Sequence, residues 1–323
     1  MKILAVVVRY KMPLSESPTL QGLYDVFSSQ PDLARGYTVM IWDNSPEAIV
    51  NPQLSIVFLY RHSKVNLGIS GAYNCAVEYA IEHGYPWVLL LDQDTQITEE
   101  FLLTMLRHSL DLLPREEIAA IVPTVRAGRN VISPARQLFS LRGIPCKYPA
   151  GECGIAPGEA TAINSGCIMR VASLQTIGGF SLDFFLDYSD VYVFHQFFVH
   201  GMKVWRAADV EIEHDLSILD YDRLMTPWRY RNFSYAETAF YDLYNGRIEN
   251  AVQTLRLFAR AIKQRMKYDN PEFSRIAWDQ FMYRLRVPQA ERIARWLTEG
   301  KKRAAQQADR TGEMGRPVYN EFP

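Results

Sequence analysis

Three groups of polar residues in the first third of the chain have the types and spacing to do chemistry. They are Asp43-Asn44-Ser45, then Asn66-Leu67-Gly68-Ile69-Ser70-Gly71 with Asn74 just beyond, and then Asp92-Gln93-Asp94. In an open parallel sheet, ligands bind at the carboxyl ends of the strands, which is where these groups are expected. Each group alone also suits a turn, a cap or a solvated acid. Their succession along the chain favours a shared binding site.

The pair Asp92 and Asp94 carries the most informative chemistry. Residues 88–91 indicate a fully buried strand, and two carboxylates at its exit can share a hard divalent cation that also holds phosphate oxygens. Such a cation neutralises the charge that develops on a departing diphosphate. His214 follows another apolar run, residues 210–212, and its imidazole is a candidate to complete the metal site.

An aromatic block later in the chain holds two more acids, Asp187 and Asp190. Desolvation in such a setting raises the pKa of a carboxylate and makes it a better base. The structural alternative is that Asp190 caps a helix beginning near Val191. Further on, Arg229 and Arg231 have the fork geometry that pairs with diphosphate oxygens. Trp205 is a flat face for a sugar or, by default, a core residue.

The elements that must position these residues follow a strand and helix alternation, which predicts an α/β fold with parallel strands covered by helices. The expected strands are residues 3–8, 38–42, 56–60, 87–91 and 118–122. A helix is expected over residues 70–83, with Gly84 as its stop. Residues 126–159 lack clean periodicity and predict a long loop. From about Pro227 the pattern predicts helices, with a soft boundary near residue 220.

Composition excludes several classes of protein. The formal net charge of −1 gives no electrostatic reason to expect a nucleic-acid partner. No apolar run is long enough to span a bilayer, and Arg9 and Lys11 follow the first apolar run without a cleavage site, so a cytoplasmic protein is expected. The fingerprints G-x-G-x-x-G after the first strand and G-x-x-x-x-G-K-[ST] are both missing. Four cysteines form no C-x-x-C pair and are expected to be free thiols.

Taken in order, the motifs resemble the inverting glycosyltransferases of family 2, and among them the rhamnosyltransferase-like bacterial enzymes. The resemblance covers roughly residues 1–235. The motifs that carry it are Asp43-Asn44-Ser45, Asn66-x-Gly68 with Asn74, Leu91-Asp92-Gln93-Asp94, Ser165-Gly166, Gly178-Gly179-Phe180 and Phe185-Leu186-Asp187-Tyr188-Ser189-Asp190.

The resemblance implies a GT-A fold, a Rossmann-like, mostly parallel central sheet flanked by helices, with a helical C-terminal extension. Residues 1–220 would form the catalytic domain, with a nucleotide-binding half over 1–115 and an acceptor and base half over 116–220. Largely beyond the reach of the resemblance, the residue pattern predicts that residues 221–323 form a helical region that contacts a membrane or a second subunit. Within it, residues 255–267 carry five basic residues, no acid and one apolar face, which suits an anionic membrane or, equally, a packed or solvated helix face.

The resemblance also assigns roles to residues. Asp190 would be the general base, with Asp187 as second choice. Asp94 and His214 would ligate Mg²⁺ or Mn²⁺, and Asp92 would reach the metal through a water. The nucleotide sugar would be contacted by Asp43, Asn44, Asn66, Gly68, Asn74, Asp92, Gln93, Arg229 and Arg231. The acceptor would be contacted by Ser165, Gly166 and Trp205. Tyr192 and Gln196 depart from the family pattern, which usually has Glu and Arg near these positions.

The expected function is therefore metal-dependent, inverting transfer of a sugar to a saccharide or lipid-linked saccharide of a bacterial surface polysaccharide (O-antigen, capsule or cell wall), at the inner face of the cell membrane. The favoured donor is dTDP-rhamnose, with a UDP-sugar as an alternative. Two rival functions stay open. Asp92-Gln93-Asp94-Thr95 also matches the D-x-D-x-T pattern of phosphohydrolases, whose first acid is a nucleophile. The departures at Tyr192 and Gln196 fit a catalytically silent sugar-nucleotide-binding subunit.

Overall fold

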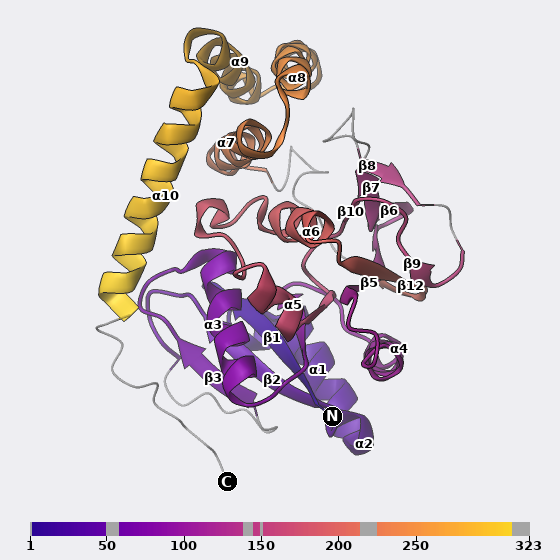
Figure 1. Cartoon of the computed structure of the whole chain (residues 1–323). Coiled ribbons are helices and arrows are strands. Elements are labelled where there is room, and N and C mark those ends of the chain that lie inside the picture. Colours follow the sequence, from indigo (N-terminus) through magenta and orange to yellow (C-terminus); the bar gives the residue numbers. More distant parts are fainter. Residues whose placement is uncertain (1, 50–57, 138–144, 149–150, 214–224, 312–323) are drawn as a thin grey trace.

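The computed structural model describes residues 2–49, 58–137, 145–148, 151–213 and 225–311. A twisted central sheet lies at the middle of the molecule, with helices on both faces and a stack of long helices beyond (Figure 1). Along the main path of the sheet, its described strands have the order β3-β2-β1-β4-β11-β5-β12-β9, with β6 paired to β5. Their bounds are Phe58–His62 for β3, Tyr37–Asp43 for β2, Ile3–Arg9 for β1, Trp87–Asp92 for β4, Ile168–Arg170 for β11, Ile118–Ala127 for β5, Lys203–Glu213 for β12, Gly154–Ile155 for β9 and Asn130–Ser133 for β6.

The pairing confirms the predicted mixed α/β architecture. Strands β3, β2, β1 and β4 pair in parallel, as do β5 and β12, while β11 runs antiparallel between β4 and β5. Every residue of β1 is buried, as expected for a central parallel strand that is covered on both faces. The described part of the third predicted strand begins at Phe58, and residues 50–57 lie outside the described residues.

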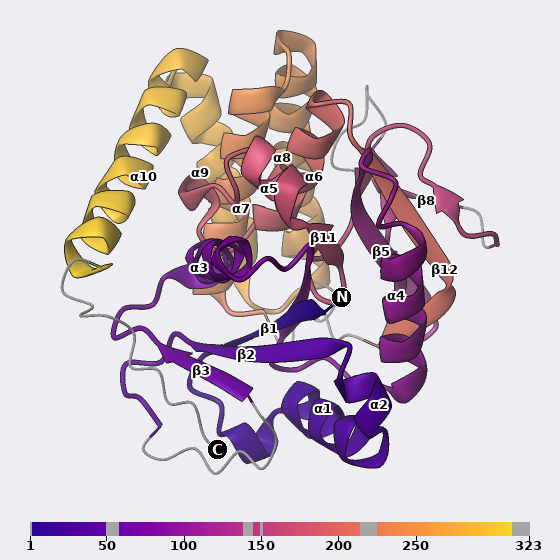
Figure 2. The ribbon, with the colours of Figure 1, turned by 60° about the horizontal axis from the view of Figure 1, so that its bottom comes forward.

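Helices cover both faces of the sheet because successive strand side chains point in opposite directions. On one face, Leu4 and Val6 of β1 pack with helices α3 (Gly68–Glu82), α5 (Val171–Thr176) and α6 (Ser189–Val199). On the other face, Ile3 and Ala5 pack with α1 (Pro18–Ser29) and α4 (Glu99–Asp111), next to the short helix α2 (Pro31–Ala34). Figure 2 shows α3 and α1 on opposite sides of strands β1 to β3. The 3-10 helices η1 (Leu14–Glu16) and η2 (Leu182–Phe184) lie in connections.

Residues 126–159 differ from the predicted long loop. Strands β7 (Ala135–Gln137), β8 (Pro145–Lys147) and β10 (Ala160–Thr161) form a small antiparallel sheet in the order β10-β7-β8, and β6 and β9 add to the main sheet. Strands of two to four residues are too short to show a period, so only pairing partners that are distant in sequence reveal them.

The C-terminal region is helical, as predicted, with α7 (Pro227–Tyr244), α8 (Arg247–Lys267), α9 (Pro271–Arg286) and α10 (Gln289–Thr311). A buried ion cluster joins these helices, since Asp242 of α7 accepts from Arg284 of α9 at 3.0 Å and from Arg292 of α10 at 2.7 Å. The predicted boundary near residue 220 falls in 214–224, outside the described residues. Among the described helices, none combines the length and apolarity needed to cross a membrane.

Candidate active site

The Asp92-Gln93-Asp94 turn begins at the last residue of β4, at the carboxyl edge of the sheet. Hydroxyl groups hold its main chain in place: the Asp92 amide donates to Ser165 Oγ at 3.0 Å, and Ser165 Oγ lies 2.6 Å from Thr95 Oγ1. The Gln93 side chain accepts from the amide of Tyr10 at 2.9 Å. The Asp92 side chain is half-buried and that of Asp94 is exposed. The turn is therefore rigid in its backbone and presents its acids at the edge of the sheet.

Ser165 and Gly166, predicted to meet the acceptor, support this turn from behind. Gly166 has φ of +87°, and a Cβ there would lie 2.4 Å from Cδ1 of Ile212 on β12. Its amide donates to the carbonyl oxygen of Leu90 at 2.8 Å. Both residues therefore contact the protein itself, at β4 and its neighbouring strands. His214, the predicted metal ligand after β12, lies outside the described residues.

Asp43, predicted to contact the nucleotide, is fully buried at the end of β2. Its Oδ2 pairs with the guanidinium of Arg9 and accepts from the Tyr60 hydroxyl at 2.7 Å, while Oδ1 accepts from the Ser45 amide at 2.9 Å. Arg9 and Tyr60 were not singled out in the sequence. The parallel register places Arg9 directly opposite Asp43, so strand pairing is the signal that would have found it.

Asn44 fixes the loop that leads into α3. Its Oδ1 accepts from the Leu67 amide at 3.2 Å, and its Nδ2 donates to the Gly68 carbonyl oxygen at 3.0 Å. The exposed Asn66 side chain accepts from the Gly68 amide at 2.8 Å. Gly68 has φ of +66°, and a Cβ there would lie 2.3 Å from the carbonyl oxygen of Phe185. The start of α3 therefore packs directly against the aromatic block, with no room for a side chain at Gly68.

Two further contacts fasten the aromatic block to α3. Ser70 Oγ donates to the Phe184 carbonyl oxygen at 2.6 Å and lies 2.9 Å from Ser189 Oγ. The Asn74 amide group accepts from the Phe180 amide and donates to the Phe180 carbonyl oxygen, both at 2.8 Å. The predicted nucleotide contact Asn74 thus has its side chain committed to this loop.

Asp190 lies in the first turn of α6, which begins at Ser189 with Tyr188 at the N-cap. The alternative that Asp190 caps a helix beginning near Val191 is wrong, because the helix begins earlier. Asp190 Oδ1 accepts from the Val191 amide at 2.8 Å. The pKa of the Asp190 carboxyl is raised to about 6, chiefly by burial and also by the nearby carboxylates of Asp187 and Asp92, while the hydrogen bond from the Val191 amide opposes the shift.

Asp187 lies beside Asp190 in a strained segment, since the intervening Tyr188 has φ of +67°. Burial raises the pKa of Asp187, and the guanidinium of Arg229 opposes this shift. Arg229 Nη2 is 3.7 Å from Asp187 Oδ1, while the buried Oδ2 has no hydrogen-bond partner among the described residues. Arg231 is exposed on α7. Of the two predicted diphosphate contacts, the structure brings Arg229 to the acids.

Tyr73 of α3 joins the turn after β4 to α6. Among the described residues its buried hydroxyl has no hydrogen-bond partner at regular geometry, and burial raises the pKa of Tyr73 well above the usual value. The next causes of this shift are the charges of Asp92, Cys167 and Asp190. Asp92 and Asp190 therefore lie close to the same hydroxyl. The structure brings together one acid of each predicted cluster.

Trp205 does not lie with this group. On β12 it belongs to the core on the α4 face, where its ring is 6.3 Å from that of His108 and 5.6 Å from the Arg115 guanidinium. Asp92 lies on the other face of the sheet, because Leu90, two residues before it on β4, belongs to the core on the α3 side. The structure therefore places Trp205 in the packing between the sheet and α4.

Sequence reasoning missed one polar side chain near the turn. The Asn164 side chain is buried next to Ser165, and its Oδ1 has no hydrogen-bond partner among the described residues. An unpaired buried acceptor costs free energy, so such a group indicates a site for a polar ligand or water. Its position directly before the Ser165-Gly166 motif was the available signal.

Two groups of side chains have metal-ligand chemistry. Asp92 and Asp94 supply hard oxygen donors, which suit Mg²⁺ or Mn²⁺. Within the described residues, His108, Cys153 and Asp209 also place their ligand atoms within 4.8 Å of one another. Asp209 is already engaged there, at 2.8 Å from His108 Nε2 and 2.5 Å from Arg107 Nη2. The first group fits a phosphate-bearing substrate because it lies at the carboxyl edge of the sheet.

Residues 38–178 match the family model of glycosyl transferase family 2. This range holds the Asp43, Asn66 and Asp92 motifs and ends before Asp187 and Asp190. The chain is 26% identical over 222 residues to the galactofuranosyltransferase GlfT1 of Mycobacterium tuberculosis, in strains CDC 1551 / Oshkosh and ATCC 25618 / H37Rv. The alignment covers 66% of this chain and 69% of GlfT1.

Two solved structures align with most of this chain. GalNAc-T7, crystallised with UDP, GalNAc and Mn²⁺, has a TM-score of 0.53 at 10% identity, covering 86% of this chain and 54% of that structure. TarS of S. aureus has a TM-score of 0.46 at 15% identity, covering 83% of this chain and 50% of that structure. The chain thus spans about half the length of each. The likeness to GalNAc-T7 supports the expected GT-A type of fold, and the match to the family model is confined to residues 38–178.

Proposed function

We propose that this chain is an inverting glycosyltransferase that moves a sugar from a nucleotide diphosphate donor to a saccharide acceptor. The observation that carries the proposal is that Asp92 and Asp190 lie close to each other and to the Tyr73 hydroxyl. Asp92 belongs to the turn after β4, and Asp190 lies at the start of α6. The match of residues 38–178 to glycosyl transferase family 2 supports the reaction class.

Asp190 is the proposed general base. Its raised pKa, about 6, leaves the carboxyl mostly ionised at neutral pH yet basic enough to accept a proton from a hydroxyl group. The acceptor oxygen loses its proton to Asp190 and attacks the anomeric carbon, while the bond from that carbon to the diphosphate oxygen breaks. The configuration inverts because attack and departure are on opposite faces, and no covalent enzyme intermediate forms.

Asp187 is the second choice for the base. Its Oδ2 is buried and unpartnered among the described residues, so it is also placed to accept a proton, or a hydrogen bond from a substrate hydroxyl. The nearby Arg229 favours its ionised form. In the proposal, Asp187 holds Arg229 beside the donor diphosphate, and Asp190 takes the proton.

A divalent cation, Mg²⁺ or Mn²⁺, would be held by Asp94, by Asp92 through a water and by His214, and would stabilise the charge of the leaving diphosphate. The two acids of the turn fit this role because their backbone is fixed by Ser165 and Thr95. GalNAc-T7, whose fold is similar, was crystallised with Mn²⁺ and UDP. Asp43, Asn44, Asn66 and Gln93 would shape the nucleotide pocket chiefly through the loops they fix.

The proposed donor is dTDP-rhamnose, with a UDP-sugar as an alternative, for a bacterial surface polysaccharide. The name of GlfT1 adds nucleotide-linked galactofuranose as a competing donor. The full chain should be tested by thermal shift with these donors in Mn²⁺, because a ligand that binds the folded state raises the melting temperature. The donor that binds should then release its nucleoside diphosphate only when an acceptor saccharide is added.

Each rival function predicts a different result, in this assay or in one with simple phosphate esters. Inorganic phosphate released from simple phosphate esters, without transfer, identifies the D-x-D-x-T phosphohydrolase, whose nucleophile would be Asp92. A donor that raises the melting temperature but transfers to no acceptor in a saccharide panel identifies the catalytically silent binding subunit. Either result overturns the proposed transferase.

A further inference from the structure

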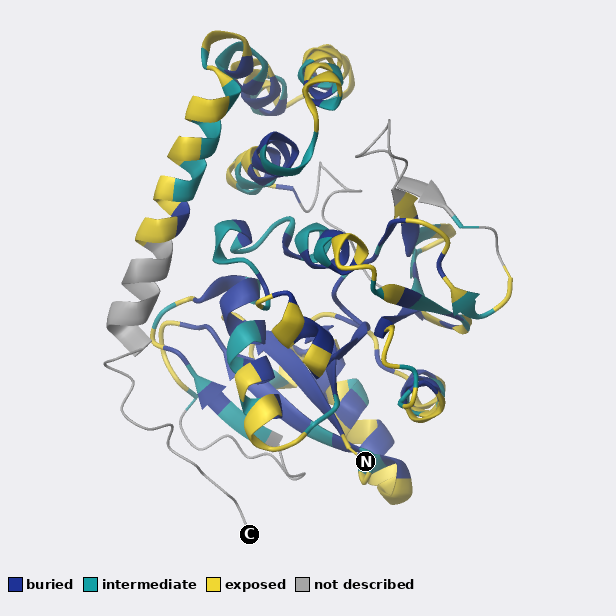
Figure 3. Cartoon of the chain, in the orientation of Figure 1, coloured by how far each residue is buried: buried dark blue, intermediate teal, exposed yellow. Residues whose placement is uncertain are grey.

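Helices α8 and α9 lie away from the sheet with their outer sides exposed (Figures 1 and 3), and exposed apolar side chains form a surface there. We call it the α8–α9 surface; it consists of Leu255, Phe258, Ile262 and Met266 of α8 and Trp278 of α9. The exposed fractions include 65% for Leu255, 47% for Ile262, 83% for Met266 and 44% for Trp278. The α8 residues are spaced by three and four, so they share one face of the helix.

This face is not needed for the packing of the helix. The buried side of α8 is formed by other residues, which include Leu257, Ala261 and Gln264. The Gln264 side chain accepts from the Tyr230 hydroxyl of α7 at 3.2 Å, so the inner side of α8 is already satisfied. A helix that is apolar on a second, exposed side indicates an interaction surface.

The charges around the face are mostly positive. No acid occurs from Asn250 to Tyr268 in the sequence, and Lys263, Arg265 and Lys267 are all exposed. On α9, Glu272 is paired with Arg275 at 3.4 Å. Glu249 in the first turn of α8 and the exposed Asp269 and Asp279 reduce the net charge, but α8 from Asn250 onward carries only cations.

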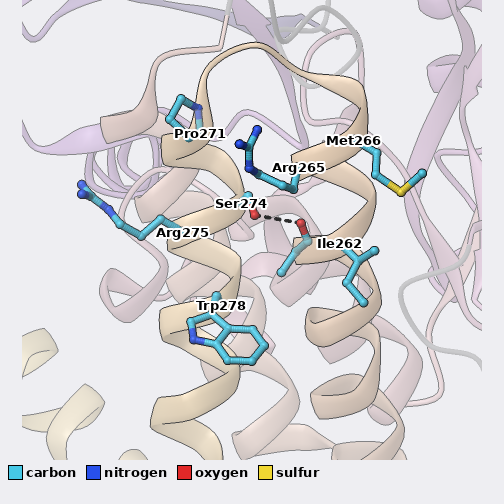
Figure 4. A pocket seen from close by; sticks show the side chains of 8 residues that line it. Ile262, Arg265, Met266, Pro271, Ser274, Arg275 and Trp278 are labelled. Atoms are coloured by element: carbon cyan, nitrogen blue, oxygen red, sulfur yellow. Dashed lines mark hydrogen bonds between the residues drawn. The ribbon is translucent and has the colours of Figure 1, made fainter.

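A hollow of about 450 Å³ lies between the end of α8 and the start of α9. Figure 4 shows Ser274 of α9 bonded across to α8, with Arg265 on one side of it and Trp278 on the other; the Ser274 hydroxyl donates to the Ala261 carbonyl oxygen at 2.9 Å. Ile262 and Met266 complete the apolar wall. A guanidinium above apolar side chains matches the boundary between lipid headgroups and acyl chains.

We propose that the α8–α9 surface binds the surface of an anionic lipid bilayer. The apolar side chains enter the headgroup and acyl boundary, and the three α8 cations meet lipid phosphates. A second copy of the chain is the less suitable occupant, because a symmetric contact through this face brings like charges together. The inference goes beyond the proposed glycosyl transfer and does not depend on it.

The test is sedimentation of the full chain with vesicles of phosphatidylcholine alone or with about one-third phosphatidylglycerol. Binding is expected only to the anionic vesicles and is expected to weaken as salt rises. The double variant Ile262→Asp with Met266→Asp should bind more than about tenfold more weakly, and Arg265→Glu about fivefold or more. Leu103→Asp, at a 56% exposed position on α4, is the matched control and should bind like the wild type.

Three results would overturn the inference: equal binding to both vesicle types, no binding to either, or equal binding by the double variant and the wild type. Self-association of the wild type that the double variant abolishes, without vesicle binding, would identify a second copy as the occupant. All substituted residues are exposed, so unchanged circular dichroism and melting temperature should accompany the binding loss. The assay contains no donor or acceptor, so its failure leaves the proposed transfer reaction untouched.

Discussion

Asp92 and Asp190 are far apart in the sequence, yet both carboxylates raise the pKa of the same buried hydroxyl, that of Tyr73. Asp92 belongs to the turn that the sequence marks as a phosphate and metal site, and Asp190 belongs to the aromatic block that it marks as a base. Their closeness also raises the pKa of Asp190 itself. This closeness of a proposed phosphate and metal site to a proposed base is what transfer from a nucleotide diphosphate sugar requires.

The first prediction concerns the base. Asp190→Asn keeps the shape of the side chain but removes the proton acceptor, so transfer should fall by about 10²- to 10⁴-fold while donor binding is nearly unchanged. Asp187→Asn should weaken donor binding more, because Arg229 loses its carboxylate partner. The measurement is steady-state transfer with a donor thermal shift for both variants. If Asp187→Asn alone abolished transfer at full donor binding, the roles of the two acids would be exchanged.

The second prediction is the pH dependence of the transfer rate. Since burial raises the pKa of Asp190 to about 6, the base is protonated below this pH, and kcat/KM should fall as the pH drops through about 6. Above it the rate should level off. In Asp190→Asn this acidic limb should vanish from the residual rate. A wild-type profile that stays flat down to pH 5 would contradict the assignment.

The same group should affect stability in a pH-dependent way. The folded protein favours the protonated Asp190, so ionisation of this carboxyl costs stability. The cost is absent below the unfolded pKa of 3.8, develops between 3.8 and about 6, and is complete above about 6. Asp190→Asn should therefore be more stable than the wild type at pH 7, by up to about 3 kcal/mol, and this gain should disappear near pH 4. Denaturant unfolding at the two pH values measures it.

The third prediction is metal dependence. Removal of divalent cations with a chelator should abolish transfer, and Mn²⁺ or Mg²⁺ should restore it, because the leaving diphosphate needs charge neutralisation. Asp94→Asn should require a higher Mn²⁺ concentration for half-maximal rate than the wild type, by about tenfold or more. Because the Asp94 side chain is exposed, the melting temperature of Asp94→Asn without metal should match that of the wild type. Full activity in the chelator would exclude the proposed metal role.

The fourth prediction tests the junction between α3 and the aromatic block. Gly68 and Gly84 have similar positive φ angles, +66° and +70°, but a Cβ at Gly68 would meet the Phe185 carbonyl oxygen, whereas one at Gly84 would meet nothing within 4 Å. Gly84→Ala should cost about 1 kcal/mol from the backbone conformation alone. Gly68→Ala should cost more than twice as much and should also reduce transfer, because the loop that carries Asp187 must move. Equal effects of the two variants on unfolding and transfer would show that the contact between Gly68 and Phe185 is not tightly packed.

Much of the fold could be read from local pattern. The buried apolar runs predicted β1, β2, β4 and β5, and the spacing of small and apolar residues predicted α3, because side-chain period is a local property of the backbone. The acids at the exit of β4 and in the aromatic block were also found locally, from their types and neighbours. The short strands within 126–159 were missed, since strands of two to four residues carry no period.

The tertiary structure alone decided which polar residues meet. Asp43 was predicted from its motif, and the register of β1 on β2 adds Arg9 opposite it; the packing of α3 brings the predicted Asn74 to Phe180. Trp205 went to the α4 face of the sheet because strand alternation fixes the side on which each residue lies. The sequence by itself determined the chemistry of each motif. Long-range strand pairing and helix packing determined which residues became neighbours, because such contacts join segments that are distant in sequence and leave no local pattern.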